Sequence, residues 1–328
     1  MASRRGRCGI CLLATATNFM SKASAGRAAP AVICTAVPAA ACQAEHRRLF
    51  DPVRLHAVLF DQRGAGRSRP RGECTANTLA HLIADLELIR AEFGFERWLV
   101  VGGSWGSTLA LAYAEAHPAR VTGLVLRATF LGTREELQTA FCNTLPQFYP
   151  ALNHDFLTLL SAEERLAPLD AYWRRILDPD PAIHGPAAWA LARYRAHAVG
   201  AHPGAHPARS QRATLIPRSA TRLPLLEAHY FQNDCFLRPG QLLAEAGRLA
   251  DIPGVIVQGR YDLLCPPATA RTLTRAWRGA ELRVIHAAGH SLFDTGVREA
   301  VVRAIDDLAC GDQLAHWPDD AGERTTYC

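Results

Sequence analysis

Short apolar segments that alternate with helical patterns are the feature that most constrains how this chain can fold. Residues 78–93 carry apolar side chains at helical spacing, and residues 107–117 form a second helical pattern closed by Pro118. Strands alternating with helices are typical of a mostly parallel sheet covered by crossover helices, so the sequence predicts an α/β fold. The apolar segments lie at residues 55–64, 97–103, 121–130, 254–259 and 281–289.

The alternation stops between residues 134 and 247, where helical and loop patterns replace the strands. Ser161 and Glu164 have the spacing of a capping box ahead of an amphipathic stretch. Because strands resume at Ile252, we interpret the interruption as a helical lid inserted into the sheet domain. The predicted units are a core at 42–133 and 248–310, a lid at 134–247, an atypical N-terminal segment at 1–41 and a C-terminal tail at 311–328.

Composition indicates an ordinary globular chain and narrows its partners. With 328 residues, 49% of them hydrophobic, a net charge of +5 and scattered arginines, neither nucleic acid nor a membrane is an expected partner. The ten cysteines are irregularly spaced, and only Cys8 and Cys11 form a C-x-x-C, which favours a reduced cytoplasmic protein without a metal. The basic start, followed by an apolar run at 8–16, leaves export or delivery to an organelle as the alternative.

The first candidate catalytic motif is Gly-Gly-Ser-Trp-Gly at residues 102–106, where a predicted strand ends and a helix begins. A G-x-S-x-G motif in this context places its serine on a tight turn, exposed for nucleophilic attack. The helix that follows stabilises negative charge near its N-terminus. Ser104 is therefore the predicted nucleophile.

A serine hydroxyl needs a base and a group that orients the base. Asp262 follows the strand at 254–259 and His290 follows the next strand, which is the Ser, acid, His order expected on this architecture. Taken singly, Asp262 would be a helix cap and His290 a polar loop residue, but their joint placement favours a catalytic triad. Such a triad needs no metal and no cofactor, so none is predicted.

Four segments together resemble the proline iminopeptidase family of α/β-hydrolases, serine peptidases that remove N-terminal proline. They read FDQRGAGRSRP, GGSWGSTLALAYAEAHP, IPGVIVQGRYDLLCP and AGHSLF. The resemblance implies an α/β-hydrolase fold with Ser104, Asp262 and His290 as the triad. It also implies that Glu227, in LLEAHYF, receives the free amino group of the substrate. From the residues alone, without the resemblance, Glu227 is predicted to be a solvent-exposed charge on a helix.

The chain departs from the family at the loop that forms the oxyanion hole. The family has His-Gly-Gly-Pro-Gly-Gly-Gly, whereas residues 35–41 here read Thr-Ala-Val-Pro-Ala-Ala-Ala. The backbone N–H of Trp105 is one expected oxyanion donor. Val37 is the candidate for the other, although a β-branched residue resists the bends that glycine allows.

The same residues suggest a reading-frame error. Codons for residues 34–41, read from the third base of the Cys34 codon, can encode the family's glycine loop, so residues 33–41 are hypothesised to be out of frame. A second departure lies in the lid, where the family has another acid that helps to hold the amine. Residues 192–224 supply no acid.

The predicted function is a serine aminopeptidase that releases N-terminal proline from small peptides through an acyl-enzyme. One alternative is an esterase or amidase that uses the same triad with a less selective lid. The other is an inactive homologue that lacks its oxyanion loop and serves at most as a binding module. Oligomeric state and the length of peptide accepted are left open by the sequence.

Overall fold

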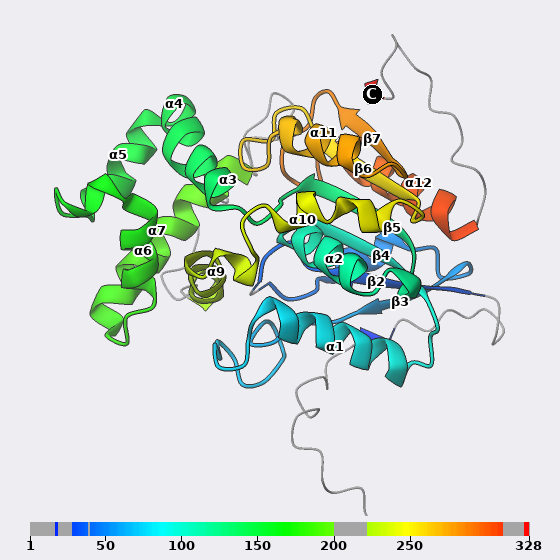
Figure 1. Ribbon diagram of the computed structural model, residues 1–328. Helices are drawn as coiled ribbons and strands as arrows, with labels where there is room; N and C mark the ends of the chain where they lie inside the picture. Colours follow the sequence, from blue (N-terminus) through cyan, green and yellow to red (C-terminus); the bar gives the residue numbers. More distant parts are fainter. Residues whose placement is uncertain (1–16, 19–27, 39, 200–221, 311–324, 328) are drawn as a thin grey trace, which may run out of the picture.

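The computed structural model describes residues 17–18, 28–38, 40–199, 222–310 and 325–327 (Figure 1). Most of the predicted C-terminal tail at 311–328, and most of the predicted N-terminal segment before residue 28, lie outside the described residues. The described residues therefore include the sheet, the helices that cover it and most of the lid.

The described strands form one sheet in the order β1-β3-β2-β4-β5-β6-β7-β8. From β3 through β8 every neighbouring pair is parallel, and only β1 runs antiparallel at the edge. The predicted α/β fold is confirmed, and each of the five apolar segments contains a strand. The strands are β1 (Thr17–Asn18), β2 (Ala29–Cys34), β3 (Leu55–Leu59), β4 (Trp98–Ser104), β5 (Val121–Thr129), β6 (Gly254–Gly259), β7 (Ala280–Ile285) and β8 (Thr325–Tyr327).

Alternating side chains on the strands supply two cores, one on each face of the sheet. On β4, Trp98 and Val100 are buried on one face, whereas Leu99 and Val101 are buried on the other. The first face packs against α1 (Leu79–Glu92), α2 (Trp105–Ala116) and α11 (Pro267–Ala276). The second face packs against α12 (Val297–Cys310) and the short 3-10 helix η2 (Ala44–Leu49) (Figure 1).

Strand β2 lies inside the sheet, between β3 and β4. Ala31 is opposite Ala57 on one side and Leu99 on the other, and Val32 is fully buried. The sheet thus includes residues before 42, the predicted start of the core. Because β2 ends at Cys34, the altered loop at 35–41 begins at the carboxyl edge of the sheet, where ligands of parallel α/β folds bind.

The interruption between β5 and β6 consists, in its described residues, of helices joined by turns, with no strand. Figure 1 shows the helices between residues 134 and 232 gathered to one side of the sheet, whereas the short helix at residues 241–244 lies beside α2. Phe156 stacks on Tyr172 and Tyr194, with ring centroids 4.0 and 4.4 Å away, and so joins three helices. The helices are α3 (Arg134–Gln138), the π-helix η4 (Thr139–Thr144), α4 (Leu145–Phe148), α5 (Pro150–Thr158), α6 (Pro168–Ile176), α7 (Pro181–Val199), α9 (Arg222–Gln232) and α10 (Gln241–Ala244).

Four further 3-10 turns complete the described helical structure. Ser161 and Glu164 make the reciprocal backbone bonds of the predicted capping box, at 2.8 and 3.2 Å, but the turn that they begin is a single 3-10 turn ahead of α6. The short turns are η3 (Pro118–Arg120), η5 (Glu164–Leu166), η7 (Asp234–Phe236) and η8 (Ala246–Leu249).

A buried acid on α2 predicts how stability depends on pH. Glu115 is 2% exposed, and neither of its carboxylate oxygens has a hydrogen-bond partner among the residues that the structure describes. Burial, reinforced by the nearby Glu245, raises the pKa of Glu115 from its usual 4.5 to about 8. The folded state therefore holds a proton that the unfolded chain releases. The contribution of this bound proton to stability is fully present below about pH 4.5 and is lost as the pH rises through 8.

We expect Glu115→Gln to flatten this dependence, because the amide cannot ionise. Between pH 5 and pH 8.5 the wild-type chain should lose on the order of 4 kcal/mol more unfolding free energy than the variant. Urea denaturation at the two pH values measures the difference. Parallel losses in both proteins would show that Glu115 does not carry it.

Candidate active site

Ser104 occupies a strained turn between β4 and α2. Its backbone has φ 54° and ψ −122°, a conformation that non-glycine residues rarely adopt. The glycines on either side make the turn fit: a Cβ on Gly102 would lie 2.2 Å from the Gly106 carbonyl oxygen, and one on Gly106 would lie 2.2 Å from that of Cys34. The G-x-S-x-G pattern is thus required by close backbone packing at both glycines.

The predicted base and its orienting acid are in contact. Nδ1 of His290 lies 2.9 Å from both carboxylate oxygens of Asp262. Backbone N–H groups of Leu264 and Cys265 donate to Oδ1 of Asp262 at 3.0 and 2.8 Å, which fixes that carboxylate. Both side chains are buried. With Nδ1 held by the acid, Nε2 of His290 is the nitrogen left to exchange a proton with the nucleophile.

Two further residues hold the histidine loop and were missed in the sequence. Arg127, on β5, donates from Nη1 to the backbone carbonyl of His290. Oδ2 of Asp294 accepts from the backbone N–H groups of Gly289 and Ser291, at 3.0 and 3.3 Å. The available signal for Arg127 was a charged residue within an apolar strand, since buried charges in strands need partners.

Cys265 lies in the same cavity wall as Ser104. Burial raises the pKa of its thiol well above the usual value, and the Ser104 hydroxyl lowers it in part. Across the part of the chain that the structure describes, no hydrogen bond joins Ser104 to His290. Catalytic contacts of this kind often form only when substrate binds, so we expect the Ser104 hydroxyl to bond to Nε2 of His290 in the substrate complex.

Asp262, Cys265 and His290 also offer three ligand atoms within 4.8 Å of one another. A metal would need the thiolate form of Cys265, whereas burial holds this thiol protonated. The Asp262–His290 contact already uses the carboxylate and Nδ1. The donor set fits proton transfer better than it fits a metal.

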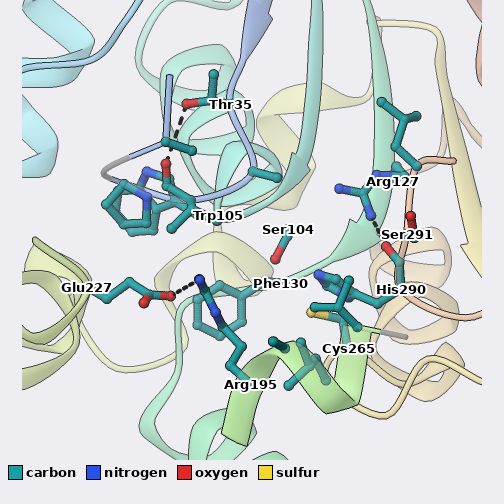
Figure 2. Close-up of a pocket in the computed structure, with 18 of the residues that line it drawn as sticks. Thr35, Ser104, Trp105, Arg127, Phe130, Arg195, Glu227, Cys265, His290 and Ser291 are labelled. Carbon is teal, nitrogen blue, oxygen red and sulfur yellow. Dashed lines mark hydrogen bonds and ion pairs between the residues drawn. The ribbon is translucent and has the colours of Figure 1, made fainter. Parts of the chain in front are cut away.

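A cavity of about 490 Å³ opens beside Ser104 and His290 (Figure 2). Its size suits a small acyl group with part of a leaving group. Aromatic and aliphatic side chains from the core and the lid form most of its wall, namely Phe130, Leu137, Phe141, Phe231 and Leu264.

The loop after β2 forms another part of the wall and changes the expected oxyanion hole. The backbone N–H of Trp105 donates to the carbonyl oxygen of Ala36 at 3.2 Å. Val37 lines the cavity, and its own carbonyl accepts from Ala40 at 3.0 Å. One predicted oxyanion donor is therefore engaged within the protein, and a carbonyl oxygen lies beside it.

Gln62 ties this loop to the nucleophile's helix. Its Nε2 donates to the Thr35 hydroxyl at 2.8 Å, and its Oε1 accepts from the Trp105 indole at 3.0 Å. All three side chains are buried. The start of the altered loop is thus held in place by hydrogen bonds.

Glu227 lies on α9 and is buried in the cavity wall, so it is not a solvated charge. Its Oε1 accepts from Nη1 of Arg195, on α7, at 2.5 Å (Figure 2). Burial raises the pKa of Glu227, and the charge and hydrogen bond of Arg195 act in the opposite direction. The structure places Ser104, Trp105, Val37, Glu227 and His290 around one cavity.

Comparison with known proteins agrees with this geometry. Residues 44–297 match the family described as alpha/beta hydrolase fold. The chain is 40% identical over 280 residues to a proline iminopeptidase of Xylella fastidiosa, covering 85% of this chain and 88% of that protein. It is 37% identical over 277 residues to one of Arabidopsis thaliana, covering 84% and 72%. The crystal structure of a proline iminopeptidase of Mycobacterium smegmatis matches its fold with a TM-score of 0.61 and 16% identity, covering 90% of this chain and 94% of that one.

The fold and the strand-to-helix serine turn define the class, which is that of the α/β-hydrolases. Within that class, the chain belongs to the proline iminopeptidase family. The resemblance inferred from the sequence motifs is thereby confirmed.

Proposed function

We propose that this protein is a serine aminopeptidase that releases proline from the free N-terminus of small peptides. The observation that carries the proposal is one cavity holding Ser104 and the Asp262–His290 pair, with the buried carboxylate of Glu227 in the same wall. The names of the relatives support a prolyl substrate. Glu227 would receive the substrate's ammonium group, since a buried carboxylate favours a charged partner over a blocked one.

The geometry supports an acyl-enzyme mechanism. His290 takes the proton of Ser104 while Asp262 holds the imidazole by Nδ1, and Ser104 then attacks the prolyl carbonyl. His290 returns the proton to the leaving amine and afterwards activates water, which releases proline. The N–H groups of Trp105 and Val37 would stabilise the oxyanion once the loop turns and the Ala36 carbonyl releases Trp105.

A second candidate activity, hydrolysis of small uncharged esters or amides, is favoured by one observation. Glu227 is already neutralised by Arg195, which leaves an apolar cavity without net charge at that wall. The same triad would serve both activities. A binding-only role would follow only if no triad-dependent turnover of either substrate class occurred.

Release of alaninamide, the leaving group common to both peptides, from Pro-Ala amide and from the matched blocked substrate N-acetyl-Pro-Ala amide tests the proposal. We expect the free peptide to be the better substrate, and Glu227→Gln to lower kcat/KM for it by about tenfold or more while the blocked peptide changes little. The Ser104→Ala protein provides the blank. Equal rates on both peptides, unaffected by Glu227→Gln, would favour the esterase or amidase alternative.

A cytoplasmic location is proposed on a separate observation. The six cysteines described as free are Cys34, Cys42, Cys74, Cys142, Cys235 and Cys265. Free thiols in this number support the reducing cytoplasm as the site of action. Among the described residues, no helix is long and apolar enough to cross a membrane.

A further inference from the structure

An arginine and a glutamate face each other in the cavity wall. Arg195 reaches Glu227 from the last turns of α7, with Nη1 and Oε1 2.5 Å apart and side chains 20% and 7% exposed. Both line the cavity that contains Ser104 and His290. In Figure 2 the two side chains point toward each other, and Ser104 lies in view between this pair and His290.

The remaining acids of the cavity are used in other contacts. Glu136 accepts from the backbone N–H groups of Leu131 and Thr133, and from the Thr133 hydroxyl. Asp294 is bonded to the backbone beside His290. Glu227 is therefore the described acid of the cavity wall best placed to bind a substrate cation, and its charge is already balanced.

We propose that Arg195 is a specificity-determining residue: it competes with the substrate's N-terminal ammonium for Glu227, and so weakens the preference of the site for a free amine over a blocked one. The inference rests on the proposed role of Glu227 as the amine-binding carboxylate. A guanidinium and an ammonium that share one carboxylate repel each other, and burial strengthens the repulsion. An acylated amine avoids this cost, because it brings no charge to the pair.

The chain supplies a matched control two residues away. Arg193 lies on the same helix, but its Nη1 pairs with Oδ2 of Asp155 at 3.2 Å, and those side chains are 31% and 55% exposed. Changing Arg193 removes the same charge from the same helix without touching Glu227. The contact of Arg195 with Glu227 uses one nitrogen, so lysine can maintain it, and Arg195→Lys is the conservative variant.

Calorimetric dissociation constants of L-prolinamide and N-acetyl-L-prolinamide, measured with Ser104→Ala present in every protein so that neither amide is hydrolysed, test the proposal. We expect Arg195→Gln to bind prolinamide about tenfold or more tightly than the wild type, with N-acetylprolinamide changed less than about threefold. Arg195→Lys and Arg193→Gln should keep the wild-type ratio of the two constants. Should Arg195→Gln fail to fold, Arg195→Met supplies the same uncharged test.

An unchanged ratio in folded Arg195→Gln, or an equal shift for both ligands, would overturn the inference. The same is true if Arg193→Gln shifts the ratio as much as Arg195→Gln does. These outcomes are separate from the fate of the proposed activity. Proline release with an unchanged ratio removes only the role of Arg195, whereas a changed ratio without any Ser104-dependent proline release removes only the peptidase.

Discussion

His290→Ala should lower kcat for a prolyl amide by about 10⁶-fold, because Ser104 then lacks the base that takes its proton. Asp262→Ala should cost less, about 10⁴-fold, since the imidazole remains but is neither oriented nor stabilised as a cation. The contact of 2.9 Å between Nδ1 and the carboxylate makes the two residues one unit. Single-turnover rates of both variants measure the effects.

The double variant provides the sharper result. If His290 and Asp262 act together, removing both should cost no more than removing His290 alone. Additive losses would show that Asp262 acts elsewhere than through the histidine. Circular dichroism and melting temperature control for damage to the fold, since both side chains are buried.

Restoring the glycine loop should raise kcat by about 10²–10³-fold, the usual value of one oxyanion donor. In the present loop the Trp105 N–H donates to the Ala36 carbonyl at 3.2 Å, so a developing oxyanion would meet a carbonyl oxygen where it needs a donor. Replacing residues 35–41 by His-Gly-Gly-Pro-Gly-Gly-Gly allows the backbone to turn its N–H groups inward. Steady-state kinetics on a prolyl amide measure the gain.

A variant with only two substitutions tests which loop residues obstruct the oxyanion hole. Ala36→Gly with Val37→Gly frees the two residues at the contact and should recover a large part of the gain, whereas Ala41→Gly alone should recover little. KM should change less than kcat, because the oxyanion exists only in the transition state. A restored loop no faster than the present one would mean that the Ala36 carbonyl does not obstruct the reaction.

Local sequence signals were sufficient for the sheet and for the nucleophile turn. The apolar segments fixed five of the strands, and the glycines at 102 and 106 fix the turn because a Cβ at either would clash with backbone. Strand β2 was not recognised, because its six residues, Ala-Pro-Ala-Val-Ile-Cys, are alanine-rich and run directly into the altered loop. Its place comes from parallel pairing with β3 and β4, which sequence neighbours do not reveal.

Contacts between distant segments explain what the sequence did not show at the site. Arg195 and Glu227 are 32 residues apart and meet only through the packing of α7 and α9. Arg127 and His290 are 163 residues apart. The hydrogen bond from Trp105 to Ala36 also depends on a loop conformation that residue types alone do not set. The sequence motifs identified the predicted reacting residues. Tertiary packing determines which charges and hydrogen-bond donors surround them.

Covalent capture of Ser104 by a prolyl diphenyl phosphonate tests the central claim most directly, because the reagent phosphonylates only an activated nucleophile, with loss of phenoxide, in a site that accepts proline. Trypsin would release residues 98–120 as one peptide, which contains Ser104 and Ser107, and fragment masses separate the two. The account predicts one adduct, on Ser104, that is lost in His290→Ala. An adduct on another residue, or capture that persists without His290, would contradict it.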